Sequence, residues 1–138
     1  MTAAQVHSFF KDYADAFSCR SADRLQKLWS FPAFMVFGGH QAVLEPDVFY
    51  TNTQRLYDFY ARQGVVRAEK EVIELTRLTD TTATARTADV LFSDNGEIVA
   101  QWEHVYLLNA TDDGIKVAAA MPDNELRAWR DRGTPLGS

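Results

Sequence analysis

The chain has 138 residues, 46% of them hydrophobic, and a formal net charge of −5 from 14 basic and 19 acidic residues. This length suits one domain with one core, so we predict a single domain over residues 1–138 whose last residues, 133–138, form a flexible tail. No two basic residues are adjacent, which argues against a nucleic-acid-binding surface, and no apolar run reaches the about 20 residues of a membrane span. Charged residues interrupt the apolar N-terminal stretch, unlike in a secretory signal peptide. We therefore expect a cytoplasmic protein without nucleic acid or membrane as a partner.

The N-terminal stretch predicts two helices. Apolar residues recur at three- and four-residue steps over about residues 3–18, which places them on one stripe of an amphipathic helix. Ser21 is a suitable N-cap for a second helix, in which Leu25 and Trp29 lie on the apolar side. This second helix should end before Pro32, because the residue that precedes a proline disfavours helical geometry.

A short hairpin and a third helix are predicted next. The ring-rich segment 31–39 ends in two glycines and indicates a strand and turn, and residues 41–44 are its expected return strand. Pro46 suits the first turn of a helix, and Gly64 suits its C-terminal end.

From Val65 onward the pattern changes to long extended segments rich in β-branched residues. Asn95-Gly96 is the strongest hairpin signal in the chain, and residues 112–114 mark another turn. Residues 124–132 predict a last short helix. Four long antiparallel strands with one apolar face must be covered, and the three N-terminal helices can supply the cover. We therefore predict an α+β roll in which a curved antiparallel sheet and the helices enclose a small-molecule cavity.

The segment DYADAFSCRSADRLQKLW resembles the first two helices of ketosteroid isomerase, without a gap between Tyr13 and Trp29. The chain as a whole is similar to the nuclear transport factor 2-like superfamily, which includes ketosteroid isomerases and SnoaL-like polyketide cyclases. This resemblance implies the cone-shaped, cystatin-like form of the α+β roll, no cofactor, and pairing of two copies through the outer face of the sheet.

The resemblance also implies candidate catalytic residues. Family isomerases place a tyrosine of the first helix and an acid of a late strand around the substrate oxygen, and Tyr13 and Glu103 match these two positions. The family's proton-shuttling aspartate has no counterpart, because this chain has Phe37-Gly38-Gly39 at that place. His40 is the nearest candidate base, and its alternative interpretation is a solvated turn residue.

The predicted hairpin at Asn95-Gly96 fixes which residues share a face of the sheet. If Asp94 pairs with Glu97, then Glu103 opposes Ala88, and the residues of one face are those expected to bind the ligand. That face carries Arg86, Val90, Gln101, Glu103 and Val105. Arg86 lies diagonal to Glu103, so the pair forms either a polar anchor inside the cavity or an exposed ion pair of little energetic weight.

The other face is the alternative lining. It carries Asp89, Trp102, His104 and Tyr106, which would bring rings and titratable groups into the cavity if this face pointed inward. Outside the cavity the same residues suit a homodimer interface, because Trp, Tyr and His combine apolar area with polar tips. We favour the interface.

Few other residues carry a specific signal. Phe17 and Tyr60 are expected to line the cavity together with Tyr13. The three histidines lie on separate elements, so no metal site is predicted. Cys19, the only cysteine, is interpreted as a small packing residue, because no histidine is placed near it by the sequence.

Three hypotheses for the function follow. The first is a small-molecule binding protein that holds a small, largely apolar ligand. The second is a cofactor-independent isomerase, dehydratase or cyclase that acts on a carbonyl substrate. The third is a non-catalytic interaction module in which the strand face with Trp102 and Tyr106 recruits another chain.

Overall fold

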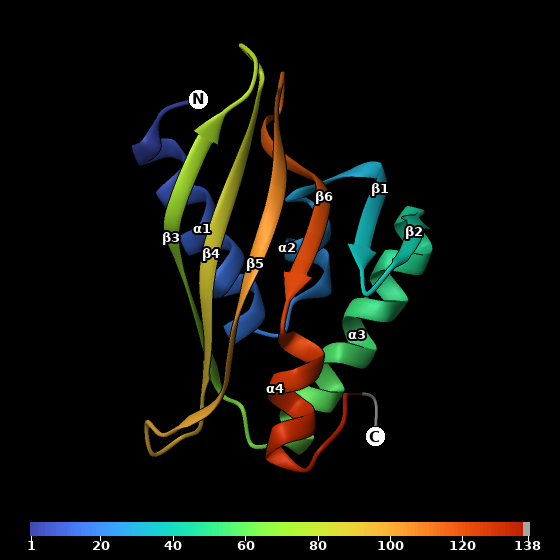
Figure 1. Cartoon of the computed structure of the whole chain (residues 1–138), viewed down its shortest axis with the longest axis vertical. Coiled ribbons are helices and arrows are strands. Elements are labelled where there is room, and N and C mark those ends of the chain that lie inside the picture. The colour runs from blue at the N-terminus through green and yellow to red at the C-terminus, as the bar shows by residue number, and fades with distance from the viewer. Residues whose placement is uncertain (137–138) are drawn as a thin grey trace.

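The computed structural model describes residues 1–136 and has helices packed on a six-stranded sheet (Figure 1). The elements in chain order are α1 (Ala3–Ser18), α2 (Ala22–Gln26), β1 (Trp29–Phe37), β2 (His40–Leu44), α3 (Pro46–Arg62), β3 (Arg67–Arg77), β4 (Thr82–Phe92), β5 (Ile98–Thr111), β6 (Gly114–Asp123) and α4 (Glu125–Arg132). The strand order is β2-β1-β6-β5-β4-β3, and only β1 and β6 are parallel. The predicted α+β architecture is confirmed.

The helices begin and end at the predicted signals, with one correction. Thr2 and Gln5 form a capping box at the start of α1, and the Ser21 side chain accepts a hydrogen bond from the backbone N–H of Arg24 at the start of α2. The prediction that Trp29 belongs to the second helix is wrong, because α2 ends at Gln26 and Trp29 begins β1. The strand places the indole in the core, where it packs 4.8 Å, centroid to centroid, from the ring of Phe49 on α3.

The hairpin between β4 and β5 has the predicted register along its length and a different turn. Ser93 N–H donates to the Glu97 carbonyl, so the turn contains three residues and Asp94 does not pair with Glu97. A β-bulge between Leu91 and Phe92 removes this offset, and Ala88 lies opposite Glu103 as predicted.

The core lies between the helices and one face of the sheet, here called the inner face. Burial alternates strictly along β4, where every second residue from Ala83 to Leu91 is buried. In β5 the same alternation buries Trp102, His104, Tyr106 and Leu108, and Val99 and Ala100 are buried near the start of the strand. Figure 1 shows α1 crossing behind β3, β4 and β5, where it covers this face. The helices therefore decide which of the two strand faces is the interior.

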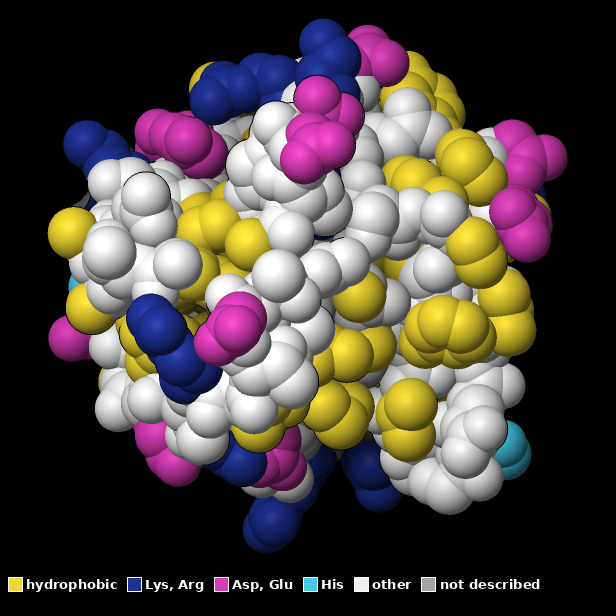
Figure 2. Space-filling model, turned by 90° about the horizontal axis from the view of Figure 1, so that it is seen from above, with side chains coloured by type: hydrophobic (Ala, Val, Ile, Leu, Met, Phe, Trp, Pro, Cys, Tyr) yellow, Lys and Arg dark blue, Asp and Glu magenta, His cyan; other side chains and the backbone are white. Residues whose placement is uncertain are grey.

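The opposite, outer face of the sheet carries no helix among the described residues, and β1 and β2 expose apolar side chains there. Phe34 and Val43, cross-strand partners, are 47% and 60% exposed. Figure 2 looks at the molecule from the top of Figure 1 and not onto this outer face; most hydrophobic side chains in that view lie in the right half, and charged side chains lie along the edge and within the left half.

The C-terminal segment closes one end of the sheet. Trp129 of α4 is fully buried and stacks on Tyr60 of α3 at 5.5 Å between ring centroids. Within the predicted flexible tail, Thr134 N–H donates to the Trp129 carbonyl and Leu136 packs against the core. The last two residues of that predicted tail, 137–138, lie outside the described residues. Within residues 1–136, no helix combines the length and apolar character needed to cross a membrane.

Candidate functional site

A cavity of about 300 Å³ lies between the helices and the inner face of the sheet. α1 contributes Tyr13 and Phe17 to its wall, and α3 contributes Tyr60. Apolar and aromatic side chains make up most of the remaining wall, and they include Leu25, Trp29, Met35, Phe37, Leu44, Phe49, Leu56, Leu91, Trp102, Tyr106, Ala120, Leu126 and Leu136. This composition is typical of small-molecule sites, which combine apolar walls with a few placed polar groups.

The polar groups of the cavity wall centre on one buried carboxylate, that of Asp89. Its Oδ2 atom lies 2.6 Å from Nζ of Lys70 and 2.5 Å from Nδ1 of His104. Its Oδ1 atom accepts a hydrogen bond of 2.8 Å from the Thr87 hydroxyl. Lys70 Nζ also donates to the Tyr106 hydroxyl oxygen at 2.7 Å. We call Lys70, Asp89, His104 and Tyr106 the polar cluster.

Adjacent strands assemble the polar cluster through their register. Lys70 of β3 is the direct cross-strand partner of Asp89 of β4. On β5, Trp102 lies opposite Asp89, and His104 and Tyr106 follow it along the same face, opposite Thr87 and Ala85. Period-two alternation puts all four side chains of the polar cluster on the inner face. The side chains of Lys70 and Asp89 are only 6% and 5% exposed, so their ion pair is shielded from water.

Burial and charge act against each other in this cluster. Burial lowers the pKa of the Lys70 ammonium below its ordinary value, although the Asp89 carboxylate raises it. Burial would raise the pKa of Asp89, but Lys70 and His104 together hold the pKa below its ordinary value. The carboxylate is therefore ionised at neutral pH.

His104 has two neighbours that compete for one ring nitrogen. The indole Nε1 of Trp102 lies 2.9 Å from His104 Nδ1, the same atom that contacts Asp89. A protonated Nδ1 donates to Asp89, whereas an unprotonated Nδ1 accepts from the indole N–H. The proton on Nδ1 therefore decides which neighbour His104 bonds.

Tyr13 lies in the wall of the cavity next to the polar cluster. Its hydroxyl accepts a hydrogen bond of 3.2 Å from Trp29 Nε1, and its ring stacks on Phe17 at 5.6 Å between centroids. Burial raises the pKa of Tyr13 well above its ordinary value, and burial likewise raises the pKa of Tyr106. Both hydroxyls therefore keep their protons and remain hydrogen-bond donors.

A second polar position lies at the end of the cavity formed by α4. Glu125 is 9% exposed, and its Oε2 atom accepts hydrogen bonds from the Tyr60 hydroxyl at 2.6 Å and from Trp129 Nε1 at 3.3 Å. Burial first, and then the neighbouring Glu125, raise the pKa of Tyr60 well above its ordinary value. This carboxylate connects α3 to α4.

The expectation that Glu103 and Arg86 line the cavity is wrong. Both point to the outer face, where Arg86 Nη1 bonds Glu103 Oε1 at 2.9 Å and Asp123 Oδ2 at 3.0 Å. Val90, Gln101 and Val105 share that face and are likewise absent from the cavity wall. The face with Asp89, Trp102, His104 and Tyr106 lines the cavity instead, because its three rings bury far more apolar area than Gln101 and Glu103 would.

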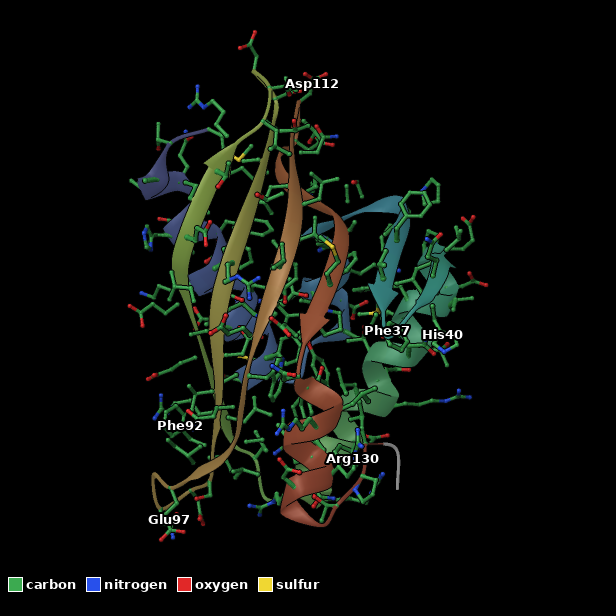
Figure 3. The ribbon with its side chains drawn as sticks, viewed as in Figure 1. Phe37, His40, Phe92, Glu97, Asp112 and Arg130 are labelled. Atoms are coloured by element: carbon green, nitrogen blue, oxygen red, sulfur yellow. The ribbon has the colours of Figure 1, made fainter. Side chains whose placement is uncertain are left out.

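This orientation also overturns the favoured interpretation of Trp102, His104 and Tyr106 as a dimer interface. Each of the three is at most 8% exposed within one chain, so none is available to a second chain. His40 is exposed at the start of β2, beside Phe37, with 6.2 Å between the ring centroids, and it does not line the cavity (Figure 3).

Sequence reasoning missed Lys70 and Glu125. The alternation of residues along β3 is a signal for Lys70. Lys70 lies on the same face of the strand as the apolar Ala68 and Val72, whereas Glu69 and Glu71 lie on the opposite face. Glu125 carries no such signal, because its burial depends on how α4 docks against α3. Among residues 1–136, no three His, Cys, Asp or Glu side chains are arranged to hold a metal ion.

The fold and the cavity define an α+β roll with a covered, curved sheet, and comparison with known proteins agrees. The model of the family described as NTF2-like protein (DUF6841) matches residues 4–125. The chain therefore belongs to this NTF2-like family. Among curated proteins, none matches the sequence.

Solved structures of the same fold are similar over most of the chain. A domain of unknown function with a cystatin-like fold from Nostoc punctiforme superposes with a TM-score of 0.71 at 17% identity, covering 95% of this chain and 83% of that one. An NTF-2 like protein of unknown function from Shewanella oneidensis has a TM-score of 0.72 at 10% identity, with coverages of 88% and 98%. A ketosteroid isomerase-like protein from Erwinia carotovora has a TM-score of 0.65 at 16% identity, with coverages of 86% and 92%. At these identities the similarity shows the fold.

Proposed function

We propose that this chain binds a small, largely apolar molecule that carries one carbonyl or carboxyl group. The observation that supports the proposal most is the cavity of about 300 Å³ whose apolar wall is interrupted by the polar cluster. An engineered cavity of about 150 Å³ is enough to bind benzene. The space here therefore suits a ligand of about two fused rings.

Lys70 is the proposed anchor for the ligand oxygen. An ammonium has three donors, and among the described residues two of them are used by Asp89 and Tyr106. The third remains for a ligand. Because the surroundings are apolar and shielded, a charge-assisted hydrogen bond from Lys70 is stronger than it would be at the surface.

The test is a calorimetric titration with naphthalene-2-carboxylate. Ala120 lines the cavity and is 1% exposed, whereas its neighbour Ala119 faces outward opposite Leu107. Ala120→Leu fills the cavity and should weaken binding by at least about tenfold, which is about 1.4 kcal/mol. Ala119→Leu should bind as the unmodified protein does. Equal affinity of both variants would contradict a ligand in this cavity.

A second titration isolates the anchor. Lys70→Met removes the ammonium and keeps the apolar stem, so it should weaken naphthalene-2-carboxylate while leaving uncharged naphthalene unchanged. Equal loss for both probes would instead indicate that the variant has disturbed the cavity.

A cofactor-independent isomerase, dehydratase or cyclase is the second candidate, and the contact between His104 and Asp89 favours it. In this proposal His104 moves the proton, Asp89 orients its ring, and the protonated hydroxyls of Tyr13 and Tyr106 stabilise the developing oxyanion. One of the proteins with a similar fold is ketosteroid isomerase-like. His40 and Glu103, the other catalytic candidates from the sequence, have no role in this proposal because both lie outside the cavity.

Its test is isomerisation of a β,γ-unsaturated cyclic ketone, followed by the absorbance of the conjugated product. His104→Gln should lower turnover by about 10²- to 10⁴-fold without changing the affinity for the product. Unchanged turnover in that variant would remove the assignment, and no turnover by the unmodified protein would leave binding as the function.

We further propose that two copies associate through the outer face of the sheet, and that the protein works in the cytoplasm, which the single cysteine suits. Half-buried Val105 and Leu107 of β5, with exposed Phe34 of β1, give this face apolar area around the Arg86 ion pairs. Trp102 and Tyr106 are buried, so they do not form a surface that recruits another chain.

A further inference from the structure

Lys70 differs from every other lysine of this chain. The sequence contains four lysines, and Lys11 and Lys27 are exposed while Lys116 is half-buried. Only Lys70 has a nearly buried side chain, at 6% exposure, and it lines the apolar cavity. A desolvated lysine next to a substrate cavity is the arrangement used by enzymes that form imines with carbonyl compounds.

We propose that Lys70 forms a covalent imine with an aldehyde or ketone held in the cavity. This inference rests on the proposed binding function, because the carbonyl compound must first enter the same cavity. It goes beyond that function by naming a nucleophile and a substrate class.

An imine requires the neutral amine, and burial favours the amine at Lys70. The Lys70 side chain is 6% exposed, and burial lowers the pKa of its ammonium below the ordinary value although the Asp89 carboxylate, 2.6 Å from Nζ, raises it. More of Lys70 is therefore present as the amine at pH 7 than of an exposed lysine.

Asp89 keeps its hydrogen-bond donors when Lys70 is an amine. The Thr87 hydroxyl donates to Oδ1 at 2.8 Å, and an amine N–H of Lys70 still reaches Oδ2 at 2.6 Å. The buried carboxylate is therefore hydrogen-bonded in the amine form as well.

The reaction then balances without a cofactor. The lone pair of Nζ attacks the carbonyl carbon, a C–N bond forms, and the C=O π pair moves to the oxygen. The resulting oxygen takes up a proton, and the nitrogen releases one to the cluster, which gives a carbinolamine. A second proton on the hydroxyl makes water the leaving group, the C–O bond breaks, and the nitrogen lone pair forms the C=N bond. One aldehyde, one amine and one proton give one iminium and one water.

Two aromatic residues suit the product. Nζ lies 5.0 Å from the ring centroid of Tyr13 and 4.8 Å from that of Tyr106, and an iminium at this position keeps the cation–π attraction of the ammonium. The Tyr106 hydroxyl, 2.7 Å from Nζ, is also close enough to donate to the carbinolamine oxygen. Burial raises the pKa of Tyr106, so this hydroxyl carries its proton at neutral pH.

The experiment is reductive trapping of the unmodified protein at pH 7 with naphthalene-2-carbaldehyde and sodium cyanoborohydride, followed by peptide mapping. An ordinary lysine pKa of about 10.4 leaves on the order of one surface lysine in a thousand as the amine at this pH. Lys70 should therefore be alkylated at least about tenfold faster than the other three lysines. The α-amino group is counted separately, because its ordinary pKa near 8 leaves more of it neutral.

Matched variants locate the reaction. Lys70→Arg keeps the cation beside Asp89 but cannot form an imine, so it should abolish the fast labelling, whereas Lys11→Arg should leave its rate unchanged. Ala120→Leu retains Lys70 and fills the cavity, and it should slow labelling at Lys70 without affecting the surface lysines. Peptide mapping of the unmodified protein identifies the labelled residue even if a variant folds poorly.

Naphthalene-2-methanol has the same ring system but cannot form an imine, so it separates this inference from the binding function. If the alcohol binds in a calorimetric titration and the aldehyde does not label Lys70 preferentially, the imine proposal is wrong and the binding function stands. If neither compound binds and Lys70 reacts no faster than the surface lysines, both proposals fail. Preferential labelling of Lys70 that the alcohol suppresses supports both.

Discussion

Asp89 is the residue on which the interior chemistry of this protein depends. Its carboxylate is almost fully buried, and every polar partner it has in the described structure comes from the inner face of β3, β4 or β5. A buried charge is tolerated only when it is paired and hydrogen-bonded. Lys70, Thr87 and His104 meet that requirement, so the same contacts that prepare the cavity for a ligand also allow this strand segment to fold.

Removing the Asp89 charge should therefore destabilise the fold. Asp89→Asn leaves the Lys70 ammonium buried without its anion, and loss of one partner of a buried pair costs about 3–5 kcal/mol. We expect a loss of this size in the free energy of unfolding at pH 7, measured by urea denaturation. Thr84→Ala on the outer face of the same strand serves as the control and should change stability by less than about 0.5 kcal/mol.

The pH dependence of stability provides a separate check on Asp89. A carboxyl whose pKa is lower in the folded protein than in the unfolded chain contributes stability above its unfolded pKa of about 3.9, and this contribution is lost as the pH falls through the folded pKa. The free energy of unfolding should thus decrease more steeply with acidification below about pH 4 in the unmodified protein than in Asp89→Asn. Identical slopes would show that Asp89 is not ionised through its contacts with Lys70 and His104.

At the scale of the elements, α4 decides whether the cavity has a closed end. The helix has only eight residues, and its buried side chains, Glu125 and Trp129, hold it against α3 and the sheet. Trp129 contacts the rings of Phe59, Tyr60 and Trp102 at 4.9, 5.5 and 6.3 Å between centroids. An isolated helix of this length is not stable in water, so these contacts determine that it forms.

Trp129→Ala should detach α4 and open the cavity. Truncation of a fully buried tryptophan costs about 3–5 kcal/mol, and hydrogen exchange should increase in residues 125–132 more than in α1. Arg127→Ala, on the exposed side of the same helix, should stay within about 0.5 kcal/mol of the unmodified protein, because its ion pair with Asp131 is solvent-exposed. Equal effects of the two changes would contradict this role for Trp129.

At the scale of the whole molecule, the two faces of the sheet have different tasks. The helices cover the inner face, and the outer face keeps Val105, Leu107 and the Arg86 ion pairs accessible. The proposed association of two copies requires this outer face, since the aromatic residues of β5 are inside.

Val105→Lys places a positive charge on the outer face, where Val105 of β5 is the cross-strand partner of Arg86 of β4. Sedimentation velocity should then show a monomer where the unmodified protein sediments as a dimer. Val48→Lys changes an equally apolar residue that is 46% exposed on α3, away from the sheet, and should leave the dimer intact. A monomeric unmodified protein, or loss of the dimer in both variants, would refute the proposed interface.

Much of the fold was predictable from local patterns. Helical spacing from Val6 to Phe17, the cap at Ser21 and the β4–β5 register all appear in the structure, because capping, periodicity and turn chemistry act over a few residues. Of the candidate site, Tyr13, Phe17 and Tyr60 were placed in the cavity wall, since each lies on the buried stripe of a helix. Lys70 was missed although it lies on the same face of β3 as the apolar Ala68 and Val72, whereas Glu125 was missed because its burial depends on how α4 docks against α3.

The sequence by itself thus determined the elements, their order, and which residues of β4 and β5 share a face, since alternation along a strand is a local property. Only the tertiary structure decided which of those two faces is inside. A strand offers both faces equally, and the choice falls to the one whose burial against α1 and α3 removes the most apolar area from water. That choice brought Asp89, His104 and Tyr106 into the cavity beside Lys70 and left Glu103 and Arg86 on the surface.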